Sequence, residues 1–326
     1  MAMMTLLQAI NNALDQQLTN DPTVVSYGED AGFEGGVFRV TAGLQAKHGE
    51  DRVFDTPIAE SAIVGSAVGM AIAGLKPVVE LQFSGFMFPA YNQIVVHLAR
   101  FRNRSRSNYT LPLVVRMPYG GGVRALEHHS ESLETLFAHI PGLKLVIPST
   151  PYDAKGLLTA AIKDPDPVIF FEPKKYYRAG KQEVPEEEYI VEIGKANVLQ
   201  EGTDITLVSW GAALRDTQKA LQNLKEDISI ELIDLRTIAP MDSATVVESV
   251  KKTGRLLVVS EQVKTLSIAS ELIARVNEEA FLYLEAPPVR VGGYDITIPL
   301  PKGEHHQALS DKKILRAVRS LAGYEV

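Results

Sequence analysis

The chain has 326 residues, of which 45% are hydrophobic, and this is more than one hydrophobic core usually absorbs, so we expect two domains. It contains no cysteine, which excludes disulfides, thiolate nucleophiles and cysteine metal sites and favours a reducing cytoplasm. The formal net charge of −7 repels phosphate backbones, so nucleic acid is a poor candidate partner.

The first residues, MAMMTLLQAINNALDQQL, predict an amphipathic helix, because their apolar residues recur at helical spacing. No basic region precedes an apolar run here, so we expect no secretory signal. The uncharged stretch 81–99 is interrupted by Pro89 and by several polar residues, and we therefore expect no membrane span. Arginines at 100, 102, 104 and 106 follow the helix-like segment 89–99 and indicate a helix end or a subunit contact.

Beyond the first helix, short β-branched runs alternate with longer amphipathic or small-residue segments, which is typical of a mainly parallel sheet covered by helices. The runs of the first half are residues 23–27, 52–55, 76–83, 112–117, 144–148 and 167–172. The polar stretch 173–194 predicts an interdomain connection. Further runs at 204–211, 228–235, 254–261 and 287–293 predict a smaller second α/β domain.

Two motifs suggest ligands only weakly. Gly120, Gly121 and Gly122 are followed by Val123 and Arg124, not by the lysine and hydroxyl residue of a phosphate loop, so a tight turn or a close backbone approach is the better interpretation. The histidine pairs 128–129 and 305–306 lack the spacing that places two imidazoles on one helix face for a metal, so we expect structural or surface histidines.

Glu60 directly precedes an uncharged, small-residue segment for which we predict a helix over 61–73, ended by Gly74. The carboxylate would then lie at the helix N-terminus, where the helix dipole alone explains an acid. The apolar flanks also predict burial, which would raise the pKa of Glu60 and make it a proton donor to a bound heterocycle. Spacing leaves both interpretations open.

Four long stretches together carry a resemblance to a known family. They are YGEDAGFEGGVFRVTAGLQAKHG, RVFDTPIAESAIVGSAVGMAIAGLKPVVELQFSGF, HHSESLETLFAHIPGLKLVIPSTPYDAKGLL and DPDPVIFFEPKKYYR. These stretches resemble the beta subunit of the thiamin-diphosphate-dependent 2-oxo acid dehydrogenases. The likeness covers nearly the whole chain, and EPKKYYR and GEHHQ are most similar to bacterial pyruvate dehydrogenase beta subunits. It implies an α/β fold with a transketolase-like pyrimidine-binding domain over 1–185, a linker over 186–200 and a transketolase C-terminal domain over 201–326.

The resemblance assigns roles in the pyrimidine half of a thiamin diphosphate site. The glutamate that matches Glu60 hydrogen-bonds the aminopyrimidine ring nitrogen and stabilises its protonated or imino form. Phe86 matches an aromatic residue that packs on the pyrimidine, with ordinary core packing as the alternative. Glu29 matches a pocket carboxylate, although a strand-end acid would look the same.

His129, which precedes Ser130, matches a histidine that assists acetyl transfer to lipoamide, and an imidazole can donate a proton near neutral pH. Because His128 lies beside it, the resemblance leaves open which of the two histidines matches the family residue. The resemblance also suggests a potassium site, because hard oxygen ligands suit that cation, but a helix-ending turn explains the same residues. Its ligands would be carbonyls at Ala161, Ile162, Asp164 and Asp166 together with Leu113.

A GDG motif followed some distance later by asparagines, which holds magnesium and the diphosphate in this family, does not occur in the sequence. The resemblance therefore implies an alpha subunit that supplies these ligands in an α2β2 heterotetramer. It implies as further partners the dihydrolipoyl acyltransferase core and its lipoyl domain. We expect docking of that core on the second domain, with Glu285, Asp295 and the carboxylate of Val326 as candidates.

The implied activity is oxidative decarboxylation of pyruvate and reductive acetylation of lipoamide. A branched-chain 2-oxo acid or acetoin dehydrogenase beta subunit is the alternative within the family. From another class, a non-catalytic scaffold between alpha subunit and acyltransferase core stays open. A single-chain transketolase-type enzyme is disfavoured because the diphosphate motif is absent.

Overall fold

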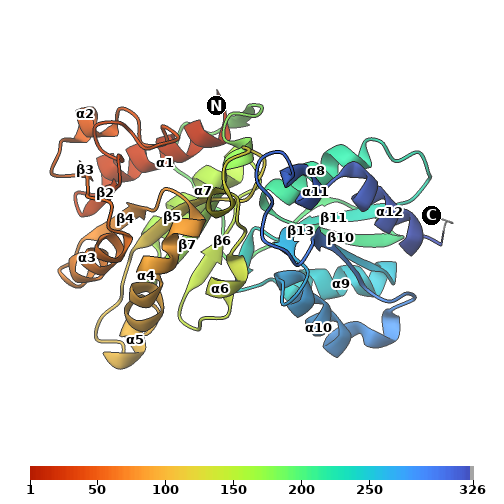
Figure 1. Cartoon of the computed structure of the whole chain (residues 1–326). Helices are drawn as coiled ribbons and strands as arrows, with labels where there is room; N and C mark the ends of the chain where they lie inside the picture. The colour runs from red at the N-terminus through yellow and green to blue at the C-terminus, as the bar shows by residue number, and fades with distance from the viewer. Residues whose placement is uncertain (324–326) are drawn as a thin grey trace. The chain divides into compact units, whose positions relative to one another are not determined.

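The computed structural model describes residues 1–323 and divides into two compact units (Figure 1). The first comprises Met1–Tyr119 and Leu136–Ile193, and the second comprises Gly120–Thr135 and the chain from Gly194 onward. Both units are built from helices and a mainly parallel sheet, so the predicted α/β class is confirmed.

The first unit is built on a parallel sheet with the order β6-β7-β5-β4-β2-β3. Each apolar run predicted in this half overlaps one of its strands. Their bounds are Val24–Gly28 (β2), Val53–Asp55 (β3), Lys76–Glu80 (β4), Val114–Tyr119 (β5), Lys144–Val146 (β6) and Val168–Pro173 (β7). The strands are almost wholly buried at the centre of the sheet, which accounts for their near-continuous hydrophobic sequences.

The predicted N-terminal helix is confirmed as α1 (Leu6–Asn20). Thr5 caps it, because the Thr5 hydroxyl accepts from the Gln8 amide at 3.2 Å while the Gln8 side chain accepts from the Thr5 amide at 3.0 Å. α1 and α7 (Pro151–Lys163) bury apolar residues in one core with the sheet. The other helical segments of this half are α2 (Leu44–His48), α3 (Glu60–Ile72), η1 (Ser84–Met87), α4 (Phe88–Asn92), η2 (Gln93–Leu98), α5 (Phe101–Arg104), α6 (Glu134–Ala138) and η4 (Lys174–Tyr176).

The polar stretch 173–194 is attached to the first unit rather than free. Its strand β8 (Gln182–Val184) pairs antiparallel with β1 (Ala2–Met4), and Val191 is buried in the first core. The buried Lys155 amine donates to three consecutive carbonyls of the stretch, those of residues 185, 186 and 187, at 2.6, 3.1 and 2.9 Å. The anchoring residues lie on β1 and α7, outside the stretch, so its polar composition did not indicate them.

The second unit carries a sheet with the order β14-β13-β10-β11-β9, in which only the pairing of the edge strand β9 with β11 is antiparallel. Its strands are Asn197–Gln200 (β9), Ile205–Ser209 (β10), Ile230–Asp234 (β11), Leu256–Val263 (β13) and Val289–Gly293 (β14), and a further short strand spans Thr237–Ala239 (β12). Its helical segments are η3 (Glu127–His129), α8 (Gly211–Leu221), α9 (Ser243–Thr253), α10 (Ile268–Ala280), η5 (Phe281–Tyr283), α11 (Glu304–Gln307) and α12 (Asp311–Leu321).

The uncharged segment that follows Glu60 forms α3, which has 13 residues and is followed by Gly74 at φ +95°. The predicted helix is thus confirmed. A helix that crosses a bilayer needs roughly 20 residues, and α3 is shorter than that. Among residues 1–323, no helix has the length and apolarity that a membrane span requires.

Candidate functional site

Two residues predicted to contact a pyrimidine follow neighbouring strands of the first sheet. Glu29 comes directly after β2, and Phe86 lies in η1, which follows β4. Because the carboxyl ends of parallel strands meet at one edge of a sheet, the fold brings both residues to that edge, where open α/β sheets bind ligands.

Glu60 begins α3, and Tyr27 of β2 fixes the position of this helix. The Tyr27 hydroxyl donates to the Ile63 carbonyl at 3.1 Å and lies 2.9 Å from the Ser66 hydroxyl. The Tyr27 ring also stacks on Phe54 of β3, with ring centroids 4.7 Å apart. Strands β2 and β3 therefore hold the first turn of α3, and with it Glu60, in one arrangement.

Glu29 is the buried carboxyl of this group, with 3% of its surface exposed. Burial, and after it the nearby charges of Glu60, Asp30 and Glu80 in that order of effect, raises the pKa of Glu29 to about 7. Its Oε1 atom is buried and has no hydrogen-bond partner within residues 1–323. Near neutral pH, Glu29 can therefore either donate or accept a proton.

The expected burial of Glu60 is wrong in degree, because its side chain is only half-buried. It lies in the first turn of α3, two residues after Ile58, which is 84% exposed. Its neighbour Glu29 is the buried carboxyl, and burial raises the pKa of Glu29.

Phe86 is half-buried and is held by an aromatic neighbour. Its ring meets Phe83 edge to face at 5.3 Å, and Phe83 meets Phe38 in the same way at 5.4 Å. A ring that is supported in this way and still partly exposed can pack against a flat heterocycle. The assignment of Glu29, Glu60 and Phe86 to a pyrimidine stays a prediction.

A buried ion network, which our sequence reasoning missed, lies on the central strands. Arg116 is fully buried and donates to both Glu172 carboxylate oxygens, at 2.6 and 3.1 Å, and to Glu80 at 3.0 Å. The Tyr177 hydroxyl donates to Glu172. The signal was present, because the apolar runs VVELQF, VVRM and VIFFE each contain one charge. Removing one partner of such a network leaves a buried, uncompensated charge.

His129 belongs to the second unit, whereas Glu29, Glu60 and Phe86 belong to the first. His129 is half-buried in η3, and its backbone amide donates to the Leu126 carbonyl at 3.0 Å. The Ser130 hydroxyl donates to the same carbonyl at 3.2 Å. By contrast, the side chain of His128 is 58% exposed and lies 3.5 Å from the Glu131 carboxylate. The role of His129 stays a prediction.

The carbonyls predicted to bind potassium lie at the end of α7, which spans Pro151–Lys163. The Ala161 carbonyl accepts from the Asp164 amide at 3.3 Å, and the Leu113 carbonyl accepts from the Val168 amide at 3.0 Å. Both Ala161 and Ile162 are buried. These are the contacts of a helix end, and each carbonyl keeps a second lone pair, so both interpretations stay open.

The carboxylates of this segment already have cationic partners. Lys144 donates to both oxygens of Asp164 at 2.7 and 2.6 Å, and Arg102 donates to both oxygens of Asp166 at 2.6 and 2.7 Å. Within residues 1–323, no group of three or more His, Cys, Asp or Glu side chains is arranged to hold a metal ion.

The candidates for docking an acyltransferase core also have local partners. Glu285 forms an ion pair with Arg255 at 2.8 Å, and Asp295 accepts from the Thr265 amide at 3.0 Å and from its hydroxyl at 2.8 Å. Val326 lies outside the described residues. Docking through these groups stays a prediction.

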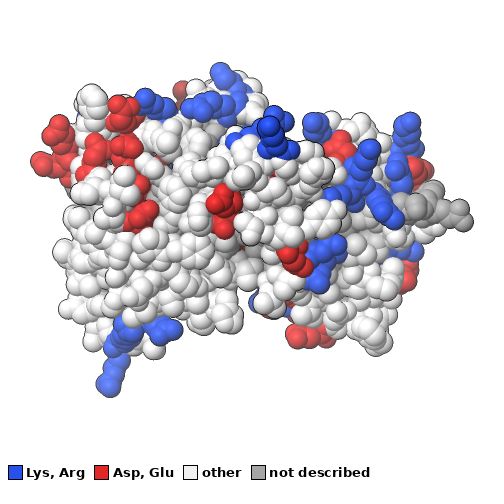
Figure 2. Space-filling view, in the orientation of Figure 1, with Lys and Arg blue, Asp and Glu red and all other residues white. Residues whose placement is uncertain are grey.

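Acidic side chains gather on the face over α2 and β3, close to the segments that carry Glu29 and Glu60 (Figure 2). Exposed acids of these segments are Asp30, Glu34, Glu50, Asp51 and Asp55. Basic side chains gather over α5 on the same view, where Arg102 and Arg104 are exposed. The two charge patches are separate, so a charged partner would meet them at different places.

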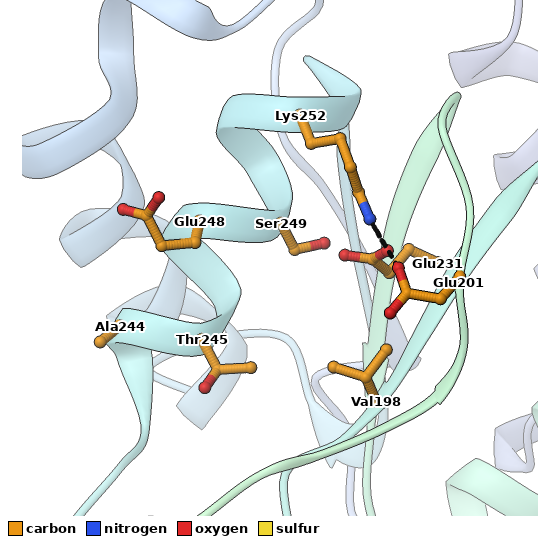
Figure 3. Close-up of a pocket in the computed structure, with 8 residues that line it drawn as sticks. All are labelled: Val198, Glu201, Glu231, Ala244, Thr245, Glu248, Ser249 and Lys252. Carbon is orange, nitrogen blue, oxygen red and sulfur yellow. Dashed lines mark hydrogen bonds and ion pairs between the residues drawn. The ribbon is translucent and has the colours of Figure 1, made fainter.

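A cleft of about 460 Å³ opens in the second unit between α9 and the strands β9 and β11 (Figure 3). Its lysine, Lys252, is paired with Glu201 at 2.8 Å and with Glu231. Because this lysine is already paired with two carboxylates, we assign no ligand to the cleft.

The fold agrees with comparison to protein families. The family described as the transketolase pyrimidine binding domain matches residues 2–180, and the transketolase C-terminal domain matches residues 194–314. A solved structure titled "Split gene transketolase, inactive beta4 tetramer" covers 100% of both chains with a TM-score of 0.80. At 22% sequence identity, that likeness shows the fold alone. These matches define the class as transketolase-like.

Curated relatives named pyruvate dehydrogenase E1 component subunit beta are much more similar in sequence. The protein of Acholeplasma laidlawii is 63% identical over 99% of both chains. That of Mycoplasma pneumoniae is 58% identical over 97% of both, and that of Bacillus subtilis is 49% identical over 98% of this chain and 99% of the relative. The chain therefore belongs to the transketolase-like family of pyruvate dehydrogenase E1 component beta subunits.

Proposed function

We propose that this chain is the beta subunit of the decarboxylating component of a pyruvate dehydrogenase complex. With an alpha subunit, it carries out thiamin-diphosphate-dependent oxidative decarboxylation of pyruvate and reductive acetylation of lipoamide. The full-length identity of 63% to a protein of that name carries the proposal. Two carboxyls at the edge of the pyrimidine-binding domain, Glu29 and Glu60, would supply the proton transfer that the reaction needs. The charge of Glu60 helps to raise the pKa of Glu29.

The residues at this edge fit the aminopyrimidine end of the cofactor. Glu29 offers a buried oxygen that has no hydrogen-bond partner within residues 1–323, together with a proton near pH 7. Glu60 would hydrogen-bond a ring nitrogen, and Phe86 would pack against the ring. Bound thiamin diphosphate would supply the carbon nucleophile and the electron sink for loss of carbon dioxide. The two carboxyls would hold and move the proton that the ring needs.

An alpha subunit would hold magnesium and the diphosphate, because the sequence lacks the motif that binds them. Two large apolar side chains beside the carboxyls support a partner there. Phe33, four residues after Glu29, and Ile58, two residues before Glu60, are each 84% exposed. Exposed apolar side chains next to a binding site favour a protein interface. We therefore propose that the alpha subunit covers them in an α2β2 tetramer.

His129 would act in the later half-reaction, in which the acetyl group passes to lipoamide on the lipoyl domain of the acyltransferase core. His129 is half-buried, and an imidazole can donate a proton near neutral pH. The proposal also includes docking of that core on the second unit. It further includes a potassium ion at the end of α7 and a cytoplasmic location.

The test is to express the chain together with the alpha subunit and to assay the purified tetramer with pyruvate and with branched-chain 2-oxo acids. We expect lipoamide-dependent turnover of pyruvate to exceed that of the branched-chain acids. A preference for the branched-chain acids or for acetoin would assign the alternative substrate. Full activity of a Glu60→Gln tetramer would instead favour the non-catalytic scaffold.

A further inference from the structure

The segment 120–135, which carries His129, is closed at its base by a backbone hydrogen bond. The Gly120 amide donates to the Glu131 carbonyl at 2.9 Å. Gly120 and Gly122 have φ values of +79° and +93°, a region that residues with a side chain seldom adopt. The glycines therefore permit a sharp return of the chain at the start of this loop.

Glu304 of α11 meets the glycine triplet from the other side. Glu304 is 6% exposed, and its Oε1 atom accepts a hydrogen bond from the Gly122 amide. A Cβ atom on Gly121 would lie 2.9 Å from the same oxygen, too close for an ordinary contact. The triplet that could suggest a phosphate loop thus receives the carboxylate of the protein itself.

Helix α11 is in turn fixed to the rest of the second unit. The Gln307 side chain accepts from the Tyr294 amide at 2.9 Å and donates to the Tyr294 carbonyl at 2.7 Å. The Lys313 amine donates to the His306 carbonyl at 3.2 Å. These contacts hold Glu304 in place, so that it acts as a fixed acceptor rather than as a mobile surface acid.

The far end of the loop has separate anchors. Fully buried Glu134 accepts from the Trp210 indole at 3.4 Å, and Thr135 accepts from Gln262 at 2.9 Å and donates to the Leu266 carbonyl at 3.2 Å. The middle of the loop, with η3, lies between these two sets of anchors. Loss of the Glu304 contact would remove the anchor at the glycine end of this segment.

We infer that Glu304 is a positioning residue, which holds the glycine turn and so orients the loop that presents His129 for acetyl transfer. The inference rests on the function proposed for His129. Loss of one hydrogen bond to a charged acceptor should lower a rate that depends on it by roughly tenfold or more.

The test uses the assembled tetramer and the variants Glu304→Ala and Glu304→Gln. Hydrogen exchange of residues 120–131 should rise in Glu304→Ala. Reductive acetylation should fall about tenfold, whereas decarboxylation with an artificial electron acceptor should change little. Glu304→Gln keeps an acceptor oxygen and should restore both readouts toward the parent. Glu231→Gln, which alters a buried carboxylate whose partners are Lys252 and Gly202, is the matched control.

Unchanged exchange in Glu304→Ala, or equal loss in both assays, overturns the inference. His129→Ala is assayed in parallel to separate two failures. If His129→Ala selectively loses acetylation and Glu304→Ala does not, the inference fails while the function of His129 stands. If His129→Ala acetylates lipoamide normally, the function of His129 fails, and the inference fails with it.

Discussion

The carboxylate of Glu60 acts on the buried carboxyl of Glu29 through space, and its charge helps to raise the pKa of Glu29 to about 7. Two acids from different elements, the end of β2 and the start of α3, therefore lie close enough for the charge of Glu60 to act on Glu29. This coupling gives the sheet edge a group that can donate and accept near neutral pH, which is what a tautomerising heterocycle requires.

Replacing Glu60 by glutamine should preserve assembly and lower decarboxylation by about 100-fold or more, because glutamine keeps the shape of the side chain and cannot transfer a proton. Decarboxylation is measured in the assembled tetramer with an artificial electron acceptor. Size-exclusion chromatography and circular dichroism serve as controls for assembly and folding. Retained turnover would return Glu60 to the role of a helix-terminal acid.

The same substitution should lower the pKa of Glu29. Burial still raises the pKa of Glu29 in Glu60→Gln, but one of the three acidic neighbours loses its charge. Carbon-detected NMR of labelled glutamate carboxyls can follow this titration in the chain, with Glu29→Gln used to assign the signal. A pKa of Glu29 that stays at about 7 in Glu60→Gln would contradict the coupling.

Glu134 should make the stability of the protein depend on pH. Burial raises the pKa of Glu134 from 4.5 to about 7, and hydrogen bonds from Trp210 and Gln262 offset only part of that effect. The folded state therefore holds the proton more tightly than the unfolded state does. The contribution of Glu134 to stability is complete below about pH 4.5 and is lost as the pH rises through about 7.

Glu134→Gln should accordingly unfold at a higher temperature than the parent at pH 8, by about 4 °C or more, and at a similar temperature at pH 5. Thermal unfolding followed by calorimetry at several pH values measures the difference. Glu231→Gln again serves as a control, because the pKa of Glu231 is lowered by hydrogen bonds that include one from Lys252. A difference in unfolding temperature between Glu134→Gln and the parent that does not grow with pH would contradict this account.

His129→Ala should impair reductive acetylation more than decarboxylation, because the proposed role belongs to the transfer of the acetyl group. His128→Ala is the matched control, since its imidazole is mostly exposed and lies one residue away. Both assays are run on each tetramer. If His128→Ala selectively loses reductive acetylation and His129→Ala keeps it, then His128 is the residue that acts in acetyl transfer.

Local sequence signals predicted much of the fold. Each long apolar run overlaps a strand, and Thr5 with Gln8 begins the first helix through a capping box. The short strands β1 and β8 were missed, because they are three residues long and depend on each other across the chain. Periodicity indicates single elements and carries little information on such distant pairs.

The site was predicted through residue type and position, but its electrostatics were not. Glu60 was expected to be the buried acid, and the structure gives that place to Glu29, because burial depends on segments that fold over it from elsewhere. The network of Arg116 with Glu80 and Glu172 has the same origin, since three isolated charges become partners only when β4, β5 and β7 pair.

The central claim is that this chain supplies one half of a thiamin diphosphate site and needs an alpha subunit for the other half. Isothermal calorimetry with thiamin diphosphate and magnesium tests it most directly, on the chain alone, the alpha subunit alone and the assembled tetramer. We predict tight, magnesium-dependent binding to the tetramer and weak or undetectable binding to the chain alone. Tight, magnesium-dependent binding to the chain alone would contradict the divided site.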